Sequence, residues 1–90
     1  MSMTNSTGRS QNTDPIPPDL LLARYVEMRR SEIGLTIEQA AWCADLDIDA
    51  WLALESGAWI PEDRTAIAAI AEALNVCRPQ ISLFAALSRN

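Results

Sequence analysis

The fold of this 90-residue chain is decided by the stretch Thr36–Gly57, TIEQAAWCADLDIDAWLALESG. Thr36 and Gln39, three residues apart, form a capping box, in which each side chain accepts a hydrogen bond from the backbone amide of the other residue. Gly57 marks a helix end, because glycine readily adopts the left-handed conformation found there. The turn Asp45-Leu46-Asp47 interrupts the helical periodicity between these signals. The stretch therefore predicts two short helices joined by a tight turn.

Apolar and small residues recur at helical spacing in both predicted helices. In the first helix they are Ile37, Ala40, Ala41 and Ala44. The alanines would let a neighbouring helix approach closely. In the second helix, which Asp47 or Asp49 caps, Trp51 and Leu54 are expected to face the core. Leu46 is the expected apolar anchor of the turn.

Two helices are predicted immediately before and after this pair. Asp19 begins the first one as a cap or first-turn acid, and Gly34 ends it after Ile33. Pro61 is predicted to lie in the first turn of the later helix, because its fixed φ suits that position, and Asn75 ends that helix. The inner face of the later helix consists of Ile67, Ile70, Ala71 and Leu74.

A fifth helix opens at Pro79, and its apolar contacts are Ile81, Phe84 and either Leu83 or Leu87. Five short helices without a strand signal predict an all-α fold. Residues 1–18 are rich in Ser, Thr, Asn and Gln and end in DPIPP, which predicts a disordered tail. Residues 19–90 are therefore expected to form one helical domain.

The charge balance and the missing residue types limit the function. The chain has 7 Arg, no Lys, 12 acids and no His, and its net charge is −5. Cys43 and Cys77 make no zinc pattern, so we expect two free thiols, no metal, no cofactor and no catalytic residue. No apolar run reaches the roughly 18 residues of a membrane span, and no signal-peptide core is present. These features predict a cytoplasmic, non-enzymatic protein without membrane contact.

Several residues match a known pattern in order and spacing: Arg30 four before Gly34, Gly34-Leu35-Thr36, Ala41, Leu46, Trp51, Glu55-Ser56-Gly57, Pro61 and Ile70 to Val76. Residues 21–76 thereby resemble the helix-turn-helix domain of Cro and phage repressors (lambda-repressor-like, XRE-type). The resemblance implies a compact five-helix bundle that contains a helix-turn-helix. It also implies an ion pair between Arg30 and Glu55, which agrees with the place of Arg30 on the apolar stripe of its helix.

The outward positions of the helix-turn-helix depart from that family, whose members carry polar and basic residues there for DNA contact. The corresponding residues are Ile37, Asp47, Ile48, Asp49, Leu52 and Ala53. Between Ser31 and Asp63 the chain has eight acids and neither Arg nor Lys. Affinity for DNA depends on cations that replace condensed counterions, and base readout depends on hydrogen-bonding side chains. This surface is therefore predicted not to read DNA.

An exposed patch that binds a protein is predicted instead, because tryptophan is a frequent anchor of interfaces. Its apolar members are Trp42, Ile48, Leu52 and Trp59, and its acidic rim is Asp45, Asp47 and Asp49. The favoured partner is a transcription regulator or another nucleic-acid-binding protein. One alternative stays open, in which one or two of the tryptophans pack into the core and leave no patch.

The alternative function is a DNA-binding transcriptional repressor that acts as a dimer through atypical contacts. Its contacts with the DNA backbone would be Arg24, Arg29, Arg64 and Arg78, of which Arg64 is the best placed. A homodimer would form through the last helix if Leu83 and Leu87 face outward. The sequence also permits the reverse arrangement, with Leu83 in the core and Phe84 exposed.

Overall fold

Five α-helices and a short 3-10 turn make up residues 17–89, the part of the chain that the structure, a computed structural model, describes. The elements are the turn η2 (Pro18–Leu20) and the helices α1 (Leu21–Ile33), α2 (Ile37–Cys43), α3 (Ile48–Ser56), α4 (Arg64–Leu74) and α5 (Arg78–Arg89). No strand occurs within these residues, and the predicted all-α bundle is confirmed. Residues 1–16 of the predicted disordered tail lie outside the part of the chain that the structure describes.

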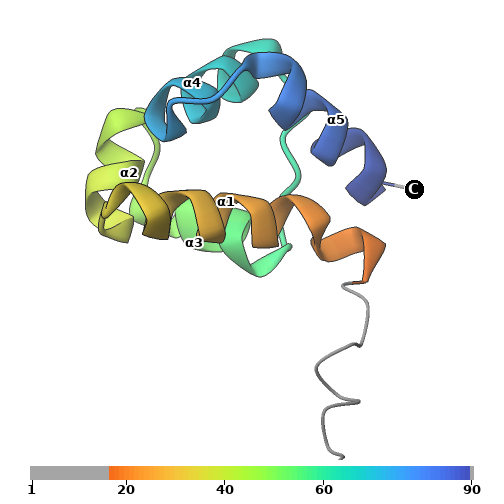
Figure 1. Cartoon of the computed structure of the whole chain (residues 1–90), viewed down its shortest axis with the longest axis horizontal. Helices are drawn as coiled ribbons and strands as arrows, with labels where there is room; N and C mark the ends of the chain where they lie inside the picture. Colours follow the sequence, from red (N-terminus) through yellow and green to blue (C-terminus); the bar gives the residue numbers. More distant parts are fainter. Residues whose placement is uncertain (1–16, 90) are drawn as a thin grey trace, which may run out of the picture.

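The helices surround one apolar core. α1 packs against α3, α4 and α5, whereas α2 packs against α3 and α4. Figure 1 shows α1 and α3 on one side of the bundle and α4 on the opposite side. The core consists of Leu22, Val26, Ala40, Ala41, Ala44, Trp51, Leu54, Ile67, Ile70, Ala71, Leu74, Ile81 and Ala85. Burial of each large apolar side chain stabilises the fold by about 1.5–3 kcal/mol, and the alanines allow the helices to approach closely.

The predicted helix ends around α2 and α3 are confirmed. The Thr36 hydroxyl accepts from the Gln39 amide at 3.0 Å, and the Gln39 side chain accepts from the Thr36 amide at 2.9 Å. Gly34 and Gly57 end α1 and α3 with φ of +88° and +84°, and Asn75 ends α4 with φ of +56°. These left-handed residues satisfy helix-end carbonyls and turn the chain toward the next element.

The start of α4 differs from the prediction. Pro61 is buried in the loop before α4 rather than placed in its first turn, so that prediction is wrong. The helix begins at Arg64, and the Asp63 carboxylate caps it by accepting from the Ala66 amide at 3.2 Å. The Pro61 carbonyl instead accepts from Arg89 of α5 at 3.1 Å. A capping carboxylate satisfies an otherwise unpaired amide, which a proline cannot do, and this determines where the helix begins.

The acids predicted to cap α1 and α3 have smaller roles than expected. Asp19 lies in η2, which precedes α1, and α1 has no side-chain cap. Asp47 occupies the cap position of α3 without a side-chain hydrogen bond, and Asp49 lies in its first turn. Asp47 and Asp49 still place negative charge at the positive end of the α3 dipole.

A charged network joins α1 to α3. Arg30 Nε donates to Glu55 Oε2 at 2.5 Å, and Arg30 Nη2 donates to Glu55 Oε1 at 3.1 Å. Trp51 Nε1 donates to the same carboxylate at 2.6 Å, and Arg30 Nη1 donates to the Leu35 carbonyl at 2.9 Å. The hydrogen bond to Glu55 raises the pKa of Arg30, although burial opposes the shift. The guanidinium is therefore always charged, and the ion pair implied by the resemblance is confirmed.

Two backbone contacts tie the C-terminal half of the bundle to α1. Arg29 Nε donates to the Leu74 carbonyl at the end of α4, at 3.0 Å. The buried Ser88 hydroxyl of α5 accepts from the Leu22 amide at 3.0 Å. That amide belongs to the first turn of α1, where no helical carbonyl is available to it. The hydroxyl of a distant helix therefore completes the start of α1.

Removal of the Glu55 carboxylate should strongly destabilise the fold. Glu55→Ala leaves a largely buried Arg30 without its charge partner and Trp51 Nε1 without its acceptor. We expect the free energy of unfolding to fall by about 3–5 kcal/mol, measured by thermal and urea unfolding followed by circular dichroism. The matched control Glu55→Gln keeps an acceptor for Trp51 and should lower the free energy of unfolding by a smaller amount. An unchanged melting temperature for Glu55→Ala would contradict the role of the pair.

The two helix-ending glycines provide a matched test of the contact between α3 and η2. A Cβ atom at Gly34 would meet no atom within 4 Å, whereas a Cβ at Gly57 would lie 2.5 Å from Leu20 Cδ2. Gly34→Ala should lower the free energy of unfolding by about 1–2 kcal/mol through backbone strain alone. Gly57→Ala should lower it by about 1 kcal/mol more, because the Leu20 side chain must move. Urea unfolding measures both, and a Leu20→Ala background should remove the excess if the contact causes it.

Candidate interaction surface

The acids between Ser31 and Asp63 lie almost entirely on the surface. Seven of the eight are exposed: Glu32, Glu38, Asp45, Asp47, Asp49, Glu62 and Asp63. The eighth, Glu55, is partly buried because it pairs with Arg30. Of the seven, only Glu32 forms an ion pair among the described residues, with Arg29 of its own helix. The surface of α2 and α3 therefore carries unneutralised negative charge.

Trp42 is the most exposed large apolar side chain of the described residues, at 85% of its full accessible area. It lies in the last turn of α2, whose buried residues are Ala40 and Ala41. Ala44, which follows α2, is buried as well. These alanines occupy the inner side of the helix, so the 3.6-residue period directs Trp42 to solvent. The expectation that Trp42 is exposed is confirmed.

Ile48 and Leu52 are exposed apolar side chains on α3. They lie four residues apart, and so share one face of the helix, with 45% and 46% of their area exposed. Trp51 and Leu54 fill the inner face, as predicted. Asp45, with φ of +56°, forms the turn before α3, and Asp47 and Asp49 flank Ile48 in sequence. We call the six residues Trp42, Ile48, Leu52, Asp45, Asp47 and Asp49 the acidic face.

Trp59 does not belong to the acidic face. It is only partly exposed and packs against the core, and its amide donates to the Ala53 carbonyl at the end of α3, at 3.1 Å. The left-handed Gly57 turns the loop back over the bundle, which brings the indole onto the core. The prediction that Trp59 joins the patch is therefore wrong, and the alternative of one packed tryptophan holds for this residue. Ile37 and Leu46 also pack partly against the core.

The arginines proposed for DNA backbone contact have different surroundings. Arg24 pairs with Glu27 at 3.5 Å within α1. Arg29 pairs with Glu32 at 3.3 Å and also donates to the end of α4. Within residues 17–89, Arg64 and Arg78 form no ion pair. Arg29 thus has a structural role, and the two arginines without an acidic partner lie on α4 and α5.

The outer face of α5 is apolar. Leu83 and Leu87 are 56% and 40% exposed, whereas Ile81 and Ala85 are buried. Phe84 instead stacks on Tyr25 of α1, with ring centroids 4.7 Å apart. The reverse arrangement, with Leu83 in the core, is therefore wrong. Leu83 and Leu87 are on the surface where a homodimer would need them, and dimerisation through them stays a prediction.

Other kinds of site find little support in the described residues. No group of three or more His, Cys, Asp or Glu lies close enough to hold a metal ion between residues 17 and 89. Cys43 and Cys77 are both free and exposed. None of the helices in the same range combines the length and the apolar character that crossing a bilayer requires. Comparisons of the chain with protein-family models, curated proteins and solved structures found no match.

The exposure of Trp42 can be measured by fluorescence, because the three tryptophans have different environments. Trp51 is fully buried, Trp59 packs partly against the core and Trp42 is exposed. Trp42→Phe should therefore remove most of the red-shifted emission and most of the quenching by acrylamide. Trp59→Phe is the matched control and should remove less of both. Equal quenching of the Trp42→Phe variant and the parent protein would mean that another surface covers Trp42 in solution.

Proposed function

We propose that this chain is a helix-turn-helix regulatory protein that acts by binding a protein partner with a basic surface. The binding surface is the acidic face. The observation that carries the proposal is the nearly complete exposure of Trp42 on a surface that carries exposed Asp45, Asp47 and Asp49. An exposed tryptophan and two exposed aliphatic side chains cost hydration free energy in the free protein. Its burial in an interface recovers that free energy.

Trp42 would be the anchor of such an interface. Tryptophan is enriched among the few interface residues whose truncation costs about 2 kcal/mol or more of binding free energy. Ile48 and Leu52 would supply the surrounding apolar contact, because each has almost half of its area exposed. The aspartates would form the polar rim, where charge acts mainly on association rate and partner choice. Because that rim is negatively charged, the proposed partner has a basic surface.

A nucleic-acid-binding protein, such as a transcription regulator, is the favoured class of partner. Such proteins carry basic surfaces that match phosphates, and an acidic face can bind the same surface by charge complementarity. The helix-turn-helix reading is supported by α2 and α3, joined through residues 44–47, and by the Arg30–Glu55 pair. The architecture is thus proposed to be retained while its outward side chains serve a different partner.

Direct DNA binding, the alternative function, has weaker support. The outer face of α3 carries Ile48, Leu52 and Asp49, which provide no cation and no hydrogen-bond donor in their side chains. Phosphate contact needs cations, and most base contacts need donors. Of the arginines considered for backbone contact, Arg29 is engaged at the end of α4. Arg24, which is exposed and pairs with Glu27, would have to compensate for the acidic face together with Arg64 and Arg78.

DNA binding provides the first test. We expect no change in the fluorescence anisotropy of a labelled mixed-sequence duplex at low salt, because the acidic face repels phosphates. Binding whose affinity falls steeply as salt rises would favour the DNA-binding alternative and overturn the proposal.

A partner assay with matched variants provides the second test. Trp42→Ala combined with Leu52→Asp should abolish capture of a partner while circular dichroism and the melting temperature stay unchanged. Leu83→Ser, which removes an exposed apolar side chain from α5, should leave capture intact. The captured protein, once purified, should bind more weakly as salt rises. Equal capture by the parent and the double variant would exclude the acidic face as the binding surface.

A further inference from the structure

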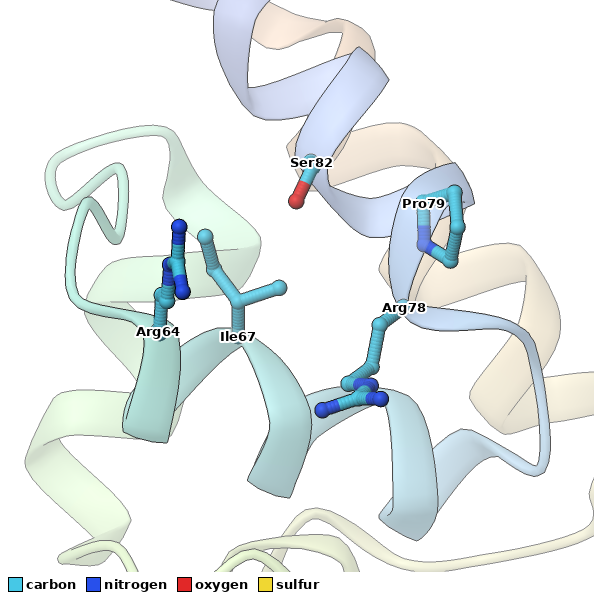
Figure 2. Close-up of a pocket in the computed structure, with 5 residues that line it drawn as sticks. All are labelled: Arg64, Ile67, Arg78, Pro79 and Ser82. Atoms are coloured by element: carbon cyan, nitrogen blue, oxygen red, sulfur yellow. The ribbon is translucent and has the colours of Figure 1, made fainter.

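Arg64 and Arg78, the arginines of residues 17–89 without an ion pair or a side-chain hydrogen bond to these residues, line the same groove. It lies between α4 and α5, has a volume of about 340 Å³, and is lined by Arg64, Ile67, Arg78, Pro79 and Ser82. Figure 2 shows Arg64 and Ile67 on α4 facing Pro79 and Ser82 on α5, with the Arg78 side chain extending toward α4. The two arginines are fourteen positions apart (78 − 64). The packing of α4 against α5 brings them together.

The charge of this groove contrasts with the rest of the surface. The other arginines of residues 17–89 each have a partner within the fold: Arg24, Arg29 and Arg30 pair with carboxylates, and Arg89 donates to the Pro61 carbonyl. Arg64 and Arg78 are exposed and have no such ion pair. Each is also the first residue of its helix, where the helix dipole is positive. Two guanidinium groups are therefore available to one bound anion.

The remaining lining indicates the chemistry of that anion. The Ser82 hydroxyl points into the space between the helices in Figure 2 and can donate a third hydrogen bond. Ile67 and Pro79 form an apolar part of the wall. Arginine presents a planar fork of donors that matches the oxygens of a phosphoryl group. We propose that the groove binds a small phosphate monoester, with the phosphoryl group between Arg64 and Arg78 and a short apolar body against Ile67 and Pro79.

The neighbouring acids favour a small ligand over a nucleic-acid backbone. A second hollow adjoins the groove on the outer side of α4 and contains Glu72 beside the same two arginines. Glu62 and Asp63 directly precede Arg64 and are exposed. An extended chain of phosphates would meet these carboxylates on leaving the groove. A single phosphoryl group can contact both arginines with less of that repulsion.

The test is a titration of the parent protein with phenyl phosphate, inorganic phosphate and phenol. We expect phenyl phosphate to shift the side-chain Nε–H signals of Arg64 and Arg78 in nitrogen–proton correlation spectra, and to raise the melting temperature. Inorganic phosphate should bind more weakly because it lacks the apolar body, and phenol should not bind. The affinity measured by calorimetry should fall as salt rises.

Matched charge variants decide whether the groove is the site. Arg64→Gln and Arg78→Gln should each weaken phenyl phosphate binding roughly tenfold, since each removes charge-assisted hydrogen bonds. Arg24→Gln removes the same charge from the exposed surface of α1 and should leave binding unchanged. Glu72→Gln should strengthen binding, because it removes a nearby negative charge.

Three results would overturn the proposal. The first is the absence of shifts at Arg64 and Arg78 with millimolar phenyl phosphate. The second is equal weakening by Arg24→Gln, which would mean that binding follows net charge. The third is a duplex DNA that shifts the same signals while phenyl phosphate does not, which would assign the arginines to a nucleic-acid backbone. The acidic face plays no part in this site, so these results are independent of the protein-binding test.

Discussion

The bidentate pair between Arg30 and Glu55 is the interaction on which the arrangement of α1, α2 and α3 depends. Its carboxylate also accepts from Trp51, and its guanidinium also donates to the Leu35 carbonyl between α1 and α2. One largely buried carboxylate therefore connects two helices, the core tryptophan and the chain that leads into α2. Such a pair contributes little net stability compared with an apolar replacement, but its bidentate geometry restricts the relative position of the two helices. That position determines which residues of α3 remain outside.

The contrast between the inner and outer faces of α2 and α3 follows from that position. Small alanines fill the inner face of α2, and Trp51 and Leu54 fill that of α3. Large apolar side chains then occur on the outer face as well, where Trp42, Ile48 and Leu52 are exposed. An outer face of this kind is not required by the fold, because burial of the inner face already forms the core. Its side chains are therefore the part of α2 and α3 that a function can explain.

Charge is distributed in two separate regions of the bundle. Seven of the eight acids between Ser31 and Asp63 are exposed, whereas Arg64 and Arg78 line the groove between α4 and α5. Among residues 17–89, Arg24, Arg29 and Arg30 pair with acids, and Arg89 donates to the Pro61 carbonyl. Arg64 and Arg78 form no such contact with the described residues. The two regions support two different ligands, a basic protein and a small anion.

The sequence by itself determined the features that depend on neighbouring residues. The capping box of Thr36 and Gln39, the left-handed ends at Gly34 and Gly57, and the inner faces of the helices were all predictable, because each arises within about one or two helical turns. The pairing of Arg30 with Glu55 was predictable through the family resemblance. Only the tertiary structure decided that Asp63 caps α4 while Pro61 lies in the preceding loop, that Trp59 packs on the core, and that Arg64 and Arg78 line one groove. These three outcomes depend on how the loop after α3 and the last two helices pack against distant residues, which local periodicity does not contain.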